Sequence, residues 1–161
     1  MFGTRLCSGL SCPDFFSMAA AAALALGFAM HAPQASELPR ASLLVDTRPV
    51  TAEVAADNAS RSHGLMFRQA LAPDHGMLFV FPEAGPVCFW MKNTPLPLSI
   101  AFIDAEGRVI NLADMQPQSL EPHCAHAPAQ YALEMEQGWF RQHNVAPGSQ
   151  VQGLPSAAGA R

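Results

Sequence analysis

The chain has 161 residues, of which half are hydrophobic and 14% are charged. This length favours a single domain, and the composition supplies enough apolar material for one packed core. The formal net charge is −4, and Lys92 is the only lysine among nine scattered Lys and Arg residues. Because nucleic-acid binding depends on clustered basic residues, these properties exclude a nucleic-acid partner from the expected functions.

The N-terminal segment resembles an export signal. Arg5 is the only charge before Asp14, and residues 18–30 form an unbroken run of Ala, Leu, Gly, Phe and Met. The run is shorter than the ~20 residues of a membrane span and is typical of a signal-peptide core. We predict a signal peptide over residues 1–35, cleaved after Ala35, and a periplasmic or secreted protein that meets the membrane only through this segment. The alternative is an uncleaved membrane anchor.

Cleavage would remove Cys7 and Cys12 and leave Cys88 and Cys124. Two thiols in an oxidising compartment predict one disulfide bond. The alternative is a pair of buried, unpaired thiols, since only the geometry decides whether two cysteines can be joined.

The mature chain is expected to form one globular domain over residues 36–154, followed by a disordered tail over 155–161. In chain order we expect strands over 41–46 and 50–56, a helix capped by Asp57 or Asn58 and running to about Phe67, and strands over 76–81 and 87–92. A hairpin over 99–104 and 108–115, a loop over 116–128, a strand over 129–136, a helical turn over 139–144 and a strand over 150–154 follow. Short strands about ten residues apart predict a mainly β (α+β) fold, a small barrel-like or rolled, mostly antiparallel sheet with short helices.

Lys92 ends an aromatic strand, on which Cys88, Trp90 and Lys92 would share one face. Lys92 could line a pocket beside the Trp90 ring and bind a polar or anionic ligand. Equally, its stem could cover Trp90 while the amine stays in solvent. Arg61 and Arg68 would lie near one face of a helix and could bind a carboxylate or phosphate. The favoured interpretation for these two arginines is structural ion pairing with Asp74 or Glu53.

Glu134 and Glu136 are two residues apart on one expected strand, so their side chains would point to the same side. Paired carboxylates are what glycoside hydrolases use. A solvated pair is the favoured interpretation, so a hydrolase is the minor alternative and the enzyme question stays open, leaning against catalysis.

A copper site is the other alternative, because imidazole and thioether ligands suit Cu(I). Its candidate ligands are His63, His75, His123 and His126 with Met66, Met77, Met91 and Met135. The methionines lie in apolar stretches, where methionine is ordinary core filler, and the histidines lack the spacing of a zinc site. The chain also contains no nucleophile elbow, phosphate loop or dinucleotide motif. We therefore predict no metal and no cofactor.

Four blocks resemble the bacterial and archaeal family called domain of unknown function 192, over roughly Val50 to Leu154. They are Arg61-x-x-Gly-Leu-Met-Phe-Arg68, Gly76-Met-Leu-Phe-x-Phe81, Phe89-Trp-Met-Lys-Asn-Thr94 and Leu133-Glu-x-x-x-Gly138. The resemblance implies a compact, β-rich, barrel-like domain with short helices, often behind a signal peptide, and no established activity. In one departure, many members carry Asp at the position of Ser99.

The resemblance favours the motif residues over the histidines as candidates for a shared function. We therefore expect an exported, non-catalytic binding or accessory domain for a small polar or anionic ligand or a cell-envelope partner. The ligand-binding candidates are Arg61, Arg68, Trp90, Lys92, Asn93, Thr94 and Glu134.

Overall fold

The computed structural model describes residues 37–161, and the predicted signal peptide lies outside them. No helix among these residues is long and apolar enough to cross a membrane. The strands are β1 (Arg40–Val45), β2 (Arg48–Ala55), β3 (His75–Gly85), β4 (Cys88–Phe89), β5 (Leu98–Ile103), β6 (Val109–Met115), β7 (His123–Cys124), β8 (Ala129–Glu136) and β9 (Val151–Gln152). The helices are α1 (Asn58–His63), α2 (Trp139–Gln142) and the 3₁₀ turn η1 (Ala157–Gly159).

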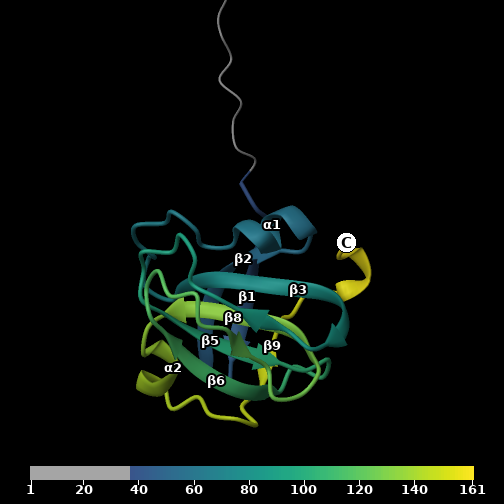
Figure 1. Cartoon of the computed structure of the whole chain (residues 1–161). Coiled ribbons are helices and arrows are strands. Elements are labelled where there is room, and N and C mark those ends of the chain that lie inside the picture. Colours follow the sequence, from purple (N-terminus) through teal and green to yellow (C-terminus); the bar gives the residue numbers. More distant parts are fainter. Residues whose placement is uncertain (1–36) are drawn as a thin grey trace, which may run out of the picture. The chain divides into compact units, whose positions relative to one another are not determined.

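Seven strands form one sheet in the order β6-β5-β8-β3-β2-β1-β9, which curls into a half-barrel (Figure 1). Only β2 and β3 are parallel, and the connection between them carries α1. A parallel pair needs such a crossover, whereas the hairpins β1–β2 and β5–β6 are closed by short turns. The two remaining strands, β4 and β7, form a separate antiparallel ribbon. The expected mainly β, rolled and mostly antiparallel fold is confirmed.

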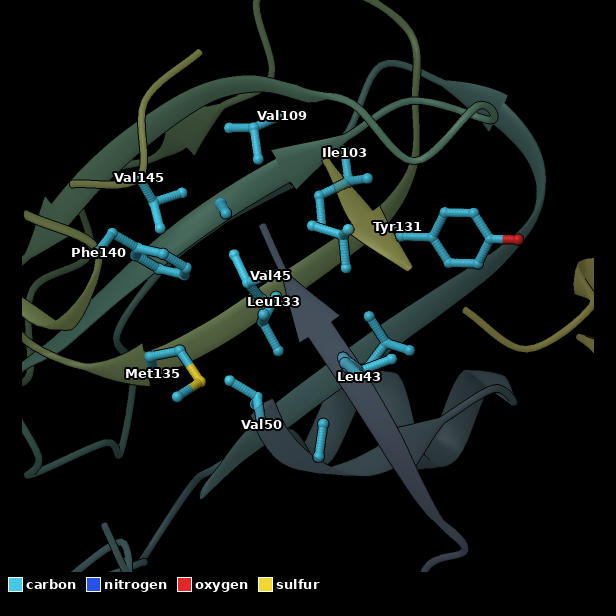
Figure 2. Close-up of a cluster of buried hydrophobic side chains, with 14 of the residues drawn as sticks. Leu43, Val45, Val50, Ile103, Val109, Tyr131, Leu133, Met135, Phe140 and Val145 are labelled. Carbon is cyan, nitrogen blue, oxygen red and sulfur yellow. The ribbon is translucent and has the colours of Figure 1, made fainter. Parts of the chain in front are cut away.

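The central strands β3, β5 and β8 are covered on both faces. Alternate residues of β8 belong to different cores: Leu133 and Met135 pack with β1, β2 and α2, while Ala132 packs with Met77 and Phe79 of β3. Figure 2 shows the first of these cores, where Leu43 and Val45 of β1 lie beside Leu133. The second core lies on the other face of the same strands. Each side of β8 therefore packs mainly against apolar side chains.

Three elements differ from the sequence-based expectation. The helix that was expected to reach Phe67 ends at His63, because Gly64 adopts φ 51° and ψ −137°, a conformation that glycine takes most readily. The strand expected over 87–92 ends at Phe89, and the loop expected over 116–128 contains β7, which pairs with β4. Asp57 caps α1 as predicted, accepting hydrogen bonds from the backbone of Ala59 and Ser60 at 2.9 Å.

Residues 155–161, for which the sequence predicts a disordered tail, contact the rest of the domain in this structure. Pro155 accepts a hydrogen bond from the Tyr131 hydroxyl at 3.1 Å, and the backbone N–H of Arg161 donates to Ala56 at 2.9 Å. Ala157 and Ala160 of the η1 segment pack against the first core. Small side chains allow this close docking, which the composition of the segment alone does not predict.

Candidate functional site

Glu134 lies on the central strand β8 and is 4% exposed. Its direct neighbours across the sheet are Met77 on β3 and Ile100 on β5, both fully buried members of the second core. The sequence-based expectation of a solvated pair with Glu136 is therefore wrong for Glu134, although Glu136 at the end of the strand is exposed. The reason is tertiary: core side chains pack on both faces of β8 and leave Glu134 little contact with water.

Burial raises the pKa of the Glu134 carboxyl from 4.5 to about 8, because removal from water disfavours the charged form. Desolvation is the only cause of this shift, and no side chain of residues 37–161 donates a hydrogen bond to the carboxyl. In the same residues, every side-chain nitrogen or oxygen that is sealed from solvent has a partner. The Glu134 oxygens, which have no protein partner, consequently keep a small contact with solvent, and this contact is made through a cavity.

The cavity has a volume of about 630 Å³, within the range of small-molecule sites. Glu134 and Thr94 supply buried polar groups to its lining. One wall is formed by α1 and the turn after it, a second by the outer part of β3, and a third by the segment that contains β4. The first wall consists of Asn58 and residues 61–66, the second of Phe79, residues 81–83 and Gly85, and the third of residues 86–90.

The aromatic side chains of the walls form a connected cluster. Phe89 packs edge-to-face on Phe79, with ring centroids 4.7 Å apart, and on Phe81 at 6.4 Å. Trp90 is 52% exposed and completes the lining beside Phe89. The cavity therefore offers apolar, aromatic walls around a small number of polar groups, which is the usual make-up of a ligand pocket.

The turn after Trp90 positions Thr94. Its backbone N–H donates to the carbonyl of Met91 at 3.1 Å, and Asn93 takes a left-handed conformation, with φ 55°. The Asn93 carbonyl accepts a hydrogen bond from the backbone of Phe67 at 2.8 Å, which joins the turn to the segment after α1. Asn93 thus organises the wall without lining the cavity.

Arg61 borders the cavity, but its guanidinium serves the protein itself. Nη1 donates to the carbonyls of Ala56 and Val80 at 2.8 and 2.7 Å, and Nη2 donates to Asn58 at 2.6 Å and to the carbonyl of Arg161. These bonds hold α1 against β3. Arg61 is a structural element of the wall, and its Nη1 and Nη2 groups are bonded to protein acceptors.

Two other predicted cations lie outside the lining. Arg68 forms the expected ion pair with Glu53, at 2.6 Å, and is not on the helix that was expected to carry it beside Arg61. Lys92 lies on an exposed turn, and its ammonium is 5.6 Å from the centre of the Trp90 ring. Of the seven predicted ligand residues, the structure brings four to the cavity (Arg61, Trp90, Thr94 and Glu134) and leaves Arg68, Lys92 and Asn93 outside it.

The predicted disulfide is present. Cys88 and Cys124 face each other across the β4–β7 ribbon and are joined through their Sγ atoms. Cys88 also lines the cavity. The bond therefore ties one cavity wall to the loop that precedes β8.

Among residues 37–161 no group of three or more His, Cys, Asp or Glu side chains is arranged to hold a metal ion. His75 hydrogen-bonds the carbonyl of Pro73 at 2.8 Å, whereas His63 belongs to the cavity lining.

At the position where the family often has Asp, Ser99 accepts a hydrogen bond from the Gly138 backbone at 2.8 Å and donates one to Asp114 on the neighbouring strand. Asp114 in turn pairs with Arg141 at 3.1 Å. In this chain the carboxylate beside position 99 is therefore that of Asp114 on β6, and not that of a residue on β5. This cluster borders a different hollow from the one that Glu134 lines.

Sequence reasoning missed most of the cavity wall. Phe79, Phe81, Phe89, Glu83 and His63 all line it. The density of phenylalanines between residues 79 and 89 was visible, but buried strands have the same composition. Only the side-by-side placement of β3 and the β4 segment distinguishes a cavity wall from ordinary core.

Comparisons with known proteins agree with this architecture. Residues 41–153 match the model of DUF192, a family described as uncharacterized ACR. A crystal structure of a proposed transcription regulator from Sinorhizobium meliloti is 38% identical with a TM-score of 0.67, covering 71% of this chain and 92% of that one. A protein of unknown function from Novosphingobium aromaticivorans is 28% identical with a TM-score of 0.65, covering 76% and 89%. A comparison with curated proteins gives no match.

Proposed function

The chain belongs to the domain of unknown function 192 family, and we propose that it is a non-catalytic binding domain whose cavity holds a small ligand with an apolar body and one polar end. The observation that carries this proposal is the Glu134 carboxyl, which is 4% exposed, has no protein partner and lines an aromatic-walled cavity. Because its oxygens meet solvent only through this cavity, a ligand there would take the place of water as their hydrogen-bond partner.

The character of the lining narrows the earlier expectation of a polar or anionic ligand. Arg68 and Lys92 do not line the cavity, and the Nη1 and Nη2 groups of Arg61 are bonded to protein acceptors. A ligand anion would therefore meet two glutamates, Glu83 and Glu134, and neither a lysine nor a free Nη donor of an arginine. The walls favour a neutral or cationic polar end.

Export remains part of the proposal. The apolar run over residues 18–30 supports cleavage after Ala35, and the Cys88–Cys124 disulfide suits an oxidising compartment such as the periplasm. Cell fractionation followed by N-terminal sequencing tests this part: the mature chain should begin at Ser36. A chain recovered from the cytoplasm with an intact N-terminus would refute it.

Binding is tested by NMR of the mature protein with three aromatic probes of matched shape: 2-phenylethanol, 2-phenylethylamine and 3-phenylpropanoate. At least one probe should shift the amide signals of Leu65, Phe89 and Thr94, which line the cavity, and leave Val45 in the other core unchanged. If none of the three perturbs the cavity signals, the binding proposal is wrong.

A hydrolase acting on envelope material is the second candidate, because His63 and Glu83 line the same cavity as Glu134. A protonated Glu134 could serve as a general acid, with a second carboxylate or an imidazole as base. Turnover of cell-wall fragments that disappears in Glu134→Gln would favour this candidate over simple binding. Full turnover in that variant would exclude it.

A further inference from the structure

We propose that the ligand of the Glu134 cavity carries a protonated amine, bound jointly by the Glu134 carboxylate and by the aromatic side chains of the walls. This inference rests on the proposed binding function and specifies the chemical class of the ligand: a small ammonium compound with an apolar body.

The first support is the carboxyl itself. Glu134 lies between Met77 and Ile100, and no described side chain donates a hydrogen bond to it. A carboxylate in such surroundings gains most from a partner that brings both a positive charge and hydrogen-bond donors. An ammonium group provides one charge and up to three donors, whereas a hydroxyl group provides a single donor and no charge.

The second support is the composition of the walls. Phe79, Phe81, Phe89 and Trp90 all line the cavity, and aromatic faces attract ammonium groups. Trp90 shows this preference within the chain, since the Lys92 ammonium already lies 5.6 Å from its ring centre. Walls of aliphatic side chains would offer a cation no such attraction.

The third support is the set of charged groups that face the cavity. Arg61 and His63 come from α1, Glu83 from β3, and Glu134 from β8. The neighbours of Glu134 on β3 and β5 carry no charge, and Cys88 is held in the disulfide. Because the Nη1 and Nη2 groups of Arg61 are bonded to protein acceptors, the ionisable side chains left to bond a ligand are the two glutamates and His63. The oxygens of the two carboxyl groups suit a ligand that donates hydrogen bonds, as an ammonium group does.

Binding of an ammonium group has a distinctive proton balance. At pH 7 the Glu134 carboxyl of the free protein holds its proton, because burial raises its pKa to about 8. The ammonium ligand binds the carboxylate form, so the Glu134 O–H bond breaks and the proton passes to the buffer while the ligand keeps its own. Close to one proton is released per ligand, and the affinity rises about tenfold from pH 6 to pH 7.

Isothermal titration calorimetry of the mature protein tests the inference with 2-phenylethylamine, 2-phenylethanol and 3-phenylpropanoate. Each titration is run at pH 6 and pH 7 in two buffers of different ionisation enthalpy, which counts the protons released. The amine should bind tighter than the alcohol at pH 7, gain about tenfold in affinity over this interval and release about one proton. The alcohol should bind equally at both pH values and release none.

Two variants localise the effect. Glu134→Gln should abolish proton release and the pH dependence for the amine while alcohol binding persists, which also shows that the variant is folded. Glu136→Gln changes an exposed carboxylate on the same strand, outside the cavity lining, and should leave proton release intact. If the alcohol or the anion binds as tightly as the amine, or if the amine releases no proton, the ammonium inference is overturned while the binding function stands. If no probe binds, both proposals fail.

Discussion

Substitution of Glu134 by Gln should make the ligand-free protein more stable at neutral pH, and the gain should grow with pH. In the folded chain the pKa of Glu134 is raised from 4.5 to about 8. Between these two values the unfolded chain has lost a proton that the folded chain keeps, so the free energy of unfolding falls as the pH rises. The slope is about 1.4 kcal/mol per pH unit for one proton.

Integrated from pH 4.5, the cost of keeping this side chain buried is about 3 kcal/mol at pH 7 and approaches about 5 kcal/mol above pH 8. Glutamine has nearly the same shape and no ionisation, so Glu134→Gln should remove this cost. At pH 5 the variant should lie within about 1 kcal/mol of the wild type. At pH 7 it should be more stable by roughly 3 kcal/mol, less whatever its amide loses by burial.

Urea unfolding of both proteins at pH 5, 6, 7 and 8, followed by fluorescence, measures this difference directly. Glu136→Gln is the matched control, since it makes the same change two residues further on the same strand at an exposed position. The difference between the two variants should widen by about 1.4 kcal/mol per pH unit up to pH 7 and by about 1 kcal/mol from pH 7 to pH 8, where the folded carboxyl itself ionises. A difference that stays constant over this range would refute the burial argument for Glu134.

Three further perturbations test other parts of the structure. Reduction of the Cys88–Cys124 bond should lower the free energy of unfolding by about 3–4 kcal/mol in urea, because it frees a loop spanning 36 residues in sequence; an unchanged midpoint would contradict this. Arg61→Gln should lower the free energy of unfolding by about 2–3 kcal/mol, because it leaves carbonyl groups unpaired, whereas Arg68→Gln should lower it by less than about 1 kcal/mol, because it removes an exposed ion pair. Equal losses in the two variants would contradict the structural role assigned to Arg61. Gly76→Ala should lower the thermal midpoint, because the added Cβ would collide with the carbonyl oxygen of Glu134, at a cost of about 1–3 kcal/mol. A midpoint equal to that of the wild type would show that β3 and β8 can move apart at this point without loss of stability.

Local sequence signals predicted the elements well wherever a short stretch of chain decides the outcome. Asp57 caps α1 through its own side chain, and the apolar run 76–81 lies within β3, which continues past Pro82 to Gly85. The hairpin around Gly107 also lies where its turn residues predicted it. Caps, turns and apolar runs involve residues close in sequence, so the sequence itself contains their cause.

The candidate site was predicted only in part. Glu134 and Thr94 were identified from motif resemblance, yet the expected companions Arg68 and Lys92 lie elsewhere. The strand that should have placed Lys92 beside Cys88 ends at Phe89, because its pairing partner β7 contains only two residues. The length of a strand depends on its partner, and that partner lies far away in the chain.

By itself, the sequence determined the family, the mainly β class, the cap of α1 and the two cysteines available for a bond. The tertiary structure alone decided that Glu134 is buried and that it lines one cavity together with four aromatic side chains. It also decided that the Arg61 guanidinium donates hydrogen bonds to backbone carbonyls. The physical reason is the position of β8 between β3 and β5. Alternation along a strand tells which residues share a face, but only the elements packed on that face decide whether it meets water.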